Sequence, residues 1–247
     1  ENLNIHGGIE IDSFRTHIFT PPLAFPPASN DQLRVLRMGI YYDRADAWGG
    51  VNIVSVDFGQ GLPILGAASN GEIAPLPSRP GARSDFSKFN ALISRQQDLH
   101  WVFPGLSMLI AGTGQATARG PLPASEQFGL GGADFGRAYE PSDLVGDNGI
   151  AGKVELQYTS VPAPSLQPFL NSYQLYTFFD AGHVMTNVAS VGKTQMSSWG
   201  AGIRMRIEEN FTSDFEVAKP LTRDISYLTG RNDARPWELF FSTALNF

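Results

Sequence analysis

Apolar and polar residues alternate along much of this chain, and that period of two constrains its fold more than any other feature. In residues 153–159, the side chains of Val154, Leu156 and Tyr158 share one face, and charged or polar side chains fill the other. Residues 203–207 read Ile-Arg-Met-Arg-Ile in the same way. A helix would scatter each set around its axis, whereas a strand separates the two sets cleanly. The pattern therefore predicts half-buried strands in an all-β fold.

About ten such segments can be recognised, separated by turn residues and proline clusters. Proline cannot donate to a sheet ladder, so these clusters mark places where strands stop. The expected strands run over residues 4–17, 34–47, 50–64, 88–102, 106–118, 150–160, 173–183, 197–208, 212–221 and 238–247. No repeat or interdomain linker interrupts them, so residues 1–247 are expected to form a single β domain.

The connections between these segments alternate in length. Short ones are expected at 48–49, 103–105 and 209–211, and 161–172 is a longer connection on the same side. Long connections are expected at 18–33, 65–87, 119–149, 184–196 and 222–237. Short turns at one end and long loops at the other are typical of an antiparallel transmembrane β-barrel, with the long loops outside the cell.

The last segment strengthens this interpretation. Residues 238–247 alternate and end on the aromatic residue Phe247. A final strand of this kind resembles the assembly signal of bacterial outer-membrane proteins. It implies the bacterial outer membrane as location, and outer-membrane lipids and the barrel-assembly machinery as partners.

Composition removes several other classes of protein. Hydrophobic residues make up 42% of the chain, and no run approaches the roughly 18 apolar residues of a transmembrane helix. The net charge is −6 without a clustered basic patch, so no nucleic-acid partner is expected. Cysteine is absent, which excludes disulfides and thiolate sites. The N-terminus shows no signal peptide, so an export signal is expected to have been removed or to lie upstream.

Motifs for catalysis or cofactor binding are also missing. Residues 191–194 end like a phosphate-binding loop, but position 187 is Asn187 where the motif needs glycine. The four histidines are not spaced as metal ligands, and no serine lies in a Gly-x-Ser-x-Gly motif. The chain is therefore not expected to be an enzyme or to hold a cofactor or metal.

Residues 129–155 and 178–182 carry the functional signal. The first block combines paired glycines, an arginine and an aromatic residue, and a Gly-Asp pair: Gly131, Gly132, Arg137, Tyr139, Gly146 and Asp147. The second block contains Phe178, Asp180 and Gly182 in the strand expected at 173–183. Together they resemble the long-loop motif and the Phe-x-Asp-x-Gly strand of two-partner secretion transporters of the haemolysin activator type, which belong to the POTRA superfamily.

The chain departs from the family at the loop tip. The family usually has Arg-Gly-aromatic there, but Ala138 follows Arg137. If position 138 needed a positive φ, its Cβ would strain the backbone. The residue before the arginine is Gly136 in place of the more usual aliphatic residue.

The resemblance implies a function and an arrangement. It implies a pore that exports a large unfolded exoprotein, of haemolysin or haemagglutinin type, from the periplasm to the cell surface. It also implies that the long loop folds into the lumen, where Arg137 meets Asp180. Such transporters carry two POTRA modules and a sixteen-strand barrel. The chain would then be the C-terminal barrel part, without those modules and the first strands.

Three other interpretations remain open at this stage. One is a barrel of the same superfamily that inserts other proteins into the outer membrane. Another is a soluble β-sandwich or lipocalin-like module that binds a ligand, which would bury Val154, Leu156 and Tyr158 in its core. The last is an outer-membrane enzyme, since a barrel fold alone does not exclude catalysis.

Overall fold

The computed structural model describes residues 1–16, 29–67, 77–167, 169–187, 194–207, 210–222 and 237–245. Within these ranges the chain forms one antiparallel sheet of ten strands, in the order β1-β2-β3-β4-β5-β8-β9-β10-β11-β12. The strands are β1 Asn2–Thr16, β2 Ser29–Ala45, β3 Gly50–Gly61, β4 Ser87–Asp98, β5 Leu106–Thr117, β8 Asn148–Ser160, β9 Ser172–Met185, β10 Thr194–Ile207, β11 Phe211–Pro220 and β12 Glu238–Leu245.

All ten expected strands are present, in an unbroken meander apart from one insertion. The largest boundary difference is in β2, which begins at Ser29 rather than at residue 34, because Ser29 and Asn30 pair with the end of β1. Phe247, expected to end the last strand, lies outside the described residues. The longest described connection, 118–147, holds a one-turn 3-10 helix, Ala124–Glu126, and a small hairpin of β6 Phe128–Leu130 and β7 Leu144–Gly146. The sequence predicted only a loop here. No helix in the described ranges is long and apolar enough to cross a membrane.

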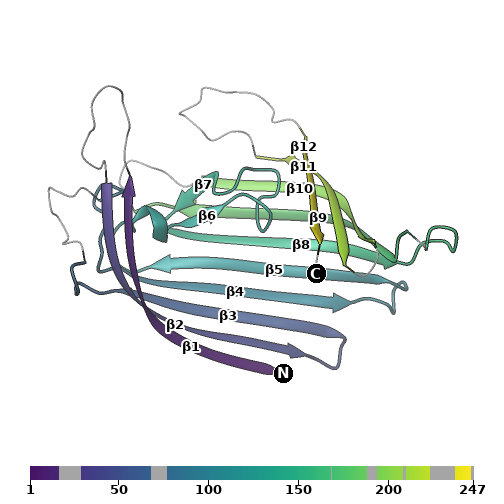
Figure 1. The fold of residues 1–247 in the computed structure, drawn as a ribbon, viewed down its shortest axis with the longest axis horizontal. Coiled ribbons are helices and arrows are strands. Elements are labelled where there is room, and N and C mark those ends of the chain that lie inside the picture. Colours follow the sequence, from purple (N-terminus) through teal and green to yellow (C-terminus); the bar gives the residue numbers. More distant parts are fainter. Residues whose placement is uncertain are drawn as a thin grey trace.

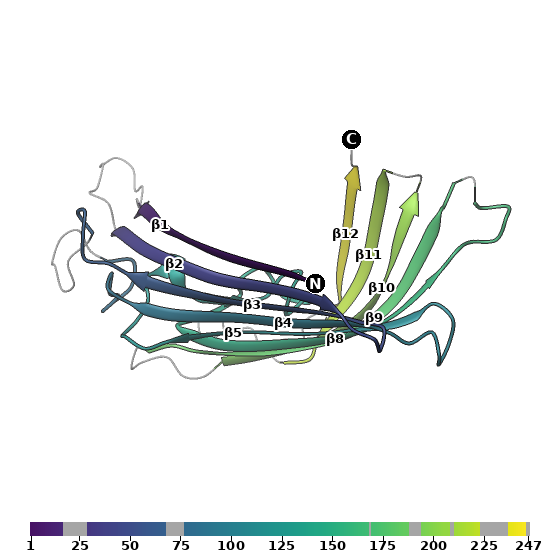
Figure 2. The same ribbon diagram turned by 90° about the horizontal axis from the view of Figure 1, so that it is seen from below.

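The sheet curves into a trough with β1 and β12 at its rims (Figure 2). The short connections 46–49 and 99–105 lie at one end of the strands, together with the longer connection between β8 and β9 (Figure 2). The described parts of the other long connections lie at the opposite end. The expected alternation therefore holds apart from the connection between β8 and β9, as the sequence indicated.

The convex, outward face of the sheet is apolar. The register places Ile110, Val154, Phe179 and Trp199 side by side on this face. Val154 and Leu156 are 43% and 42% exposed. A β-sandwich would cover such residues with a second sheet, but the described residues form no second sheet on this face. An outward apolar band is what a membrane-spanning strand presents to lipid.

The concave face carries charged and polar side chains, and the 118–147 connection folds over it (Figure 1). Two apolar clusters form where this connection meets the sheet. The larger one joins Leu130, Ala138 and Tyr139 of the connection to residues of β8, β9, β10 and β11. The connection therefore supplies the protein with a core that the single sheet alone would lack.

Candidate functional site in the loop that folds over the inner face

The arginine at the tip of the 118–147 loop is almost fully buried. The side chain of Arg137 is 5% exposed. Its Nη2 atom lies 2.7 Å from Oε2 of Glu155 on β8, and its Nη1 atom lies 3.0 Å from Oε2 of Glu216 on β11. The guanidinium also lies over the ring of Phe178 on β9, with Cζ 3.8 Å from the ring centroid. Three strands thus hold one loop side chain.

Asp180 contacts the same arginine in a different way from the one expected. Its Oδ2 atom accepts a hydrogen bond from the backbone N–H of Arg137 at 3.3 Å, and lies 3.8 Å from Nε of the guanidinium. Its Oδ1 atom accepts from the hydroxyl of Ser198 on β10. The pair implied by the resemblance is thus mainly a contact between Asp180 and the loop backbone, and the terminal guanidinium nitrogens pair with Glu155 and Glu216.

Glu155 is shared between two arginines. Its Oε1 atom accepts from Nη1 of Arg204 on β10 at 2.7 Å, while Oε2 pairs with Arg137. Arg204 stacks on the ring of Tyr176, whose hydroxyl donates to Asp214 and to Glu216 at 2.8 and 2.9 Å. Isolated charges are costly to bury, and this network gives each buried carboxylate a cation or hydroxyl partner.

The backbone at the loop tip explains the departure at Ala138. Gly136 has a φ of +86°, whereas Ala138 is not among the described residues with positive φ. The left-handed conformation therefore falls on Gly136, where no Cβ opposes it. Ala138 is 1% exposed and packs in the larger apolar cluster. The strain that the sequence suggested at this position is absent.

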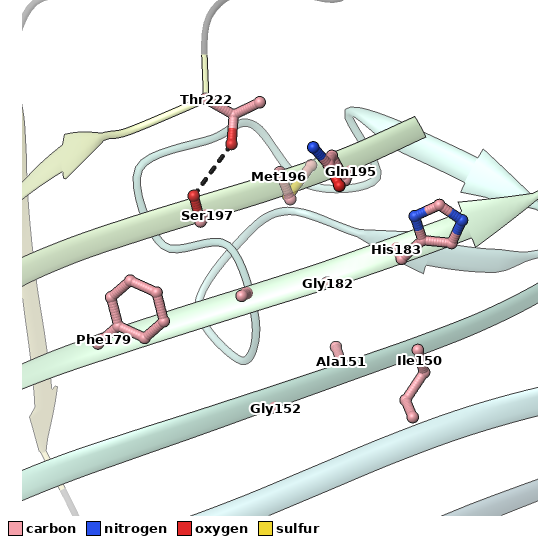
Figure 3. A pocket seen from close by; sticks show the side chains of 11 residues that line it. Ile150, Ala151, Gly152, Phe179, Gly182, His183, Gln195, Met196, Ser197 and Thr222 are labelled. Carbon is pink, nitrogen blue, oxygen red and sulfur yellow. Dashed lines mark hydrogen bonds between the residues drawn. The ribbon is translucent and has the colours of Figure 1, made fainter. Parts of the chain in front are cut away.

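Tyr139, which precedes β7, attaches the loop to the end of the sheet that carries the long connections. Its hydroxyl donates to the carbonyl oxygens of Ser197 and Thr222, at 3.0 and 3.2 Å. Ser197 and Thr222 are themselves joined by a 3.0 Å hydrogen bond between their hydroxyls (Figure 3). The tip is thus fixed through its arginine, its backbone and its tyrosine.

Small residues on the strands make room for the hairpin. A Cβ at Gly182 would lie 2.5 Å from Cδ1 of Leu130, and one at Gly146 would lie 2.8 Å from the carbonyl oxygen of Met185. Gly182 lies beside Ala151 where β8 and β9 run together (Figure 3). The hairpin and β9 approach each other closely because both positions lack side chains.

Asp147, at the root of the loop, is fully buried and paired with Arg79 at 2.6 Å. It also accepts from the backbone N–H groups of Leu122 and Asn187, at 2.7 and 2.6 Å. Burial alone would raise the pKa of this carboxyl, but the bonds from Arg79 and the two amides outweigh it and lower the pKa below its usual range. Asp147 ties the two limbs of the loop together.

The structure therefore brings the residues of both sequence blocks together around one loop. Gly131 and Gly132, both with positive φ, begin the segment that joins β6 to β7, and their backbone N–H groups donate to the carbonyl oxygens of Phe135 and Tyr139. Sequence reasoning missed Glu155, Glu216, Ser198 and Arg204 as partners. Glu155 was recoverable in principle, because the alternation already placed it on the face opposite Val154.

A cavity of about 470 Å³ lies beneath the loop tip on the inner face. Arg137, Lys153, Glu155 and Arg204 are among its lining residues, with Leu109 and Phe240. A second cavity of about 690 Å³ follows it toward the short-turn end and shares Arg204 and Asp214 with the first. The two cavities therefore share part of their lining, which combines charged groups with apolar side chains.

Comparison with known proteins agrees with this geometry. The model of the family described as haemolysin secretion/activation protein ShlB/FhaC/HecB matches residues 28–205. CdiB from Escherichia coli has a similar structure, with a TM-score of 0.77 and 18% identity over 98% of this chain. The chain spans 41% of the length of CdiB. No curated protein matches the chain significantly by sequence. The chain belongs to the haemolysin secretion/activation family of two-partner secretion proteins, which are β-barrels of the bacterial outer membrane.

Proposed function

We propose that this chain forms part of an outer-membrane pore that exports an unfolded exoprotein to the cell surface, and that the 118–147 loop controls the pore. The observation that carries the proposal is Arg137, buried on the inner face between Glu155 and Glu216. A loop held inside a lumen by a buried ionic network occupies the space through which a polypeptide would have to pass.

The inner surface fits an extended polypeptide. Its lining offers carboxylates, guanidinium groups and amides, among them Arg204, Asp214 and Gln174. Such groups can exchange hydrogen bonds with a passing backbone, and apolar side chains such as Leu109 and Phe240 lie between them. The described residues show no nucleotide site, so folding of the exoprotein outside the cell would supply the driving force.

The sheet edges support a larger barrel. The edges of β1 and β12 that face away from the sheet have no strand partner among the described residues. Unpaired backbone groups are not tolerated in the hydrocarbon region of a bilayer. We propose that further strands of the full-length protein pair with both edges and close the barrel, and that POTRA modules precede them.

The test is export of a candidate exoprotein, chosen as a large β-helical protein encoded in the same genome. Cells that produce the full-length transporter and this exoprotein should release it into the medium, and cells without the transporter should retain it. Arg137→Glu places a fourth negative charge against Glu155, Asp180 and Glu216, so it should drive the loop tip out of the lumen and change the amount of exoprotein exported while the barrel still assembles. Unchanged export by this variant contradicts control by the loop, and absence of export by the wild type contradicts the function itself.

A further inference from the structure

Besides the Arg137 network and the Asp147–Arg79 pair, the loop has a third buried ionic site, at its base. The carboxylate of Glu126 is 3% exposed. Its Oε2 atom lies 2.7 Å from Nζ of Lys88 on β4, and its Oε1 atom lies 2.8 Å from Nη2 of Arg37 on β2. One carboxylate is thus held by two cations from two strands, and Arg37 also pairs with Glu10 on β1 at 2.6 Å.

The backbone of the same residue is held as well. The carbonyl oxygen of Glu126 accepts hydrogen bonds from Nζ of Lys88 at 3.1 Å and from Nε2 of Gln115 at 3.0 Å. Four residues earlier, Leu122 packs in the smaller apolar cluster with Leu33, Val35 and Phe86, and all four are at most 1% exposed. The first limb of the loop is therefore docked by charge, by backbone and by apolar burial.

This base site shares no residue with the tip site. The base site contacts β2, β4 and β5, whereas the tip site contacts β8, β9, β10 and β11. The two groups of strands are opposite halves of the sheet order. Breaking the contacts of Arg137 removes none of the contacts of Glu126, so release of the tip leaves the base docked.

We propose that Glu126 is a positioning residue that clamps the base of the loop to β2 and β4, so that only the segment between Glu126 and Asp147 moves when the pore opens. Asp147 marks the other limit of this segment, because it binds Arg79 and the backbone of Leu122. The moving part is then the hairpin of β6 and β7 with its tip. The first limb of the loop, residues 118–126, stays attached to the sheet. This inference rests on the proposed export function.

A crosslink at the base tests the proposal directly. This chain contains no cysteine, and Leu33→Cys and Leu122→Cys, introduced in one buried cluster, can be joined by a disulfide as the full-length transporter folds in the oxidising periplasm. The bridge should leave export within about twofold of the unbridged protein, a change of less than ~0.5 kcal/mol. Loss of export on bridging would overturn the proposal, because it would show that the base of the loop must also detach from β2 and β4 during export.

Substitution of Glu126 provides the second arm. Glu126→Gln removes the charge that both cations share, so the undocked state of the base should become at least about tenfold more populated. Planar-bilayer recordings of the purified transporter should show this as more frequent large openings, and bridging positions 33 and 122 should suppress them. Glu140→Gln, at an exposed carboxylate of the same loop, is the matched control and should behave as the wild type.

The outcomes separate this inference from the proposed function. Channel openings of Glu126→Gln that match those of Glu140→Gln would overturn the clamp, whatever the state of export. A transporter that exports nothing but shows the bridge-sensitive openings would instead contradict the export function and leave the clamp supported. If Glu126→Gln fails to assemble, the crosslink in the wild-type background still decides the question.

Discussion

Replacement of Arg137 by methionine is the most informative single change, because it removes the charge and keeps most of the aliphatic length. In the structure, the guanidinium pairs with Glu155 at 2.7 Å and with Glu216 at 3.0 Å, and it stacks on Phe178. Loss of one member of a buried ion pair costs about 3–5 kcal/mol, since the partner is left buried and uncompensated.

The expected cost falls at the lower end of that range. Glu155 keeps its bond to Arg204, and Glu216 keeps the hydroxyl of Tyr176, so neither carboxylate is left without a partner. We therefore expect the loop-in state to lose about 3 kcal/mol, which is a change of roughly 100-fold in its equilibrium with the loop-out state. Arg137→Lys keeps the charge but cannot span both carboxylates, so it should lose a smaller part, about 1–2 kcal/mol.

The assay is single-channel recording of the full-length transporter, scored by the fraction of time in the large open state. Arg119→Met is the control, because Arg119 lies in the same loop but is 61% exposed and 4.0 Å from Asp85. An exposed pair of this kind contributes little. If Arg137→Met and Arg119→Met give the same open fraction, the ionic network does not hold the loop, and the reasoning is refuted.

Other changes test the close packing, the loop root and the outer face. Gly131→Ala should destabilise the hairpin by about 1–3 kcal/mol, because the φ of Gly131 is +108° and a Cβ would collide with the carbonyl oxygen of Glu140. Urea titration, with the folded barrel followed on gels, measures this loss of stability. Gly182→Val should cost about 1–3 kcal/mol by displacing Leu130, measured in the same way. Because the pKa of Asp147 is lowered, its contribution to stability should be present above about pH 4 and lost as the pH falls through the lowered value, and Asp147→Asn should remove this acid-dependent step from a pH series of thermal unfolding. Ile93→Lys, on the outward face at 62% exposure, should cost about 2–4 kcal/mol in lipid, whereas Ser94→Lys on the inward face should cost little, as folding into vesicles would show.

The strands could be predicted because each has one apolar and one polar face. The two sides of the membrane wall impose that period of two directly on the sequence, as at Val154 and Glu155. The strand ends were harder to place. β2 begins at Ser29 because polar residues there pair with β1, and polar residues near a strand end look like loop in a sequence.

The sequence pointed to Arg137 and Asp180 but not to the other residues of the ionic network. Arg137 and Asp180 lie in contact, as the family resemblance implied, but the short ion pairs of the guanidinium are with Glu155 and Glu216. Glu216 lies on a strand 79 residues away, and only the curvature and register of the sheet bring it to the loop tip. The clamp at Glu126 depends equally on distant strands, since Arg37 is 89 residues away in sequence. No local pattern encodes such contacts.

The central claim is that the tip of the 118–147 loop lies inside the pore until export begins. Ala138, beside Arg137, is 1% exposed, whereas Arg119 at the start of the loop is open to solvent. In intact cells producing the full-length protein, a membrane-impermeant maleimide should label Arg119→Cys quickly and Ala138→Cys far more slowly, and Arg137→Met should make the labelling of Ala138→Cys fast. Equal labelling of the two cysteines in an otherwise wild-type protein would show that the tip lies outside the pore and would contradict the account.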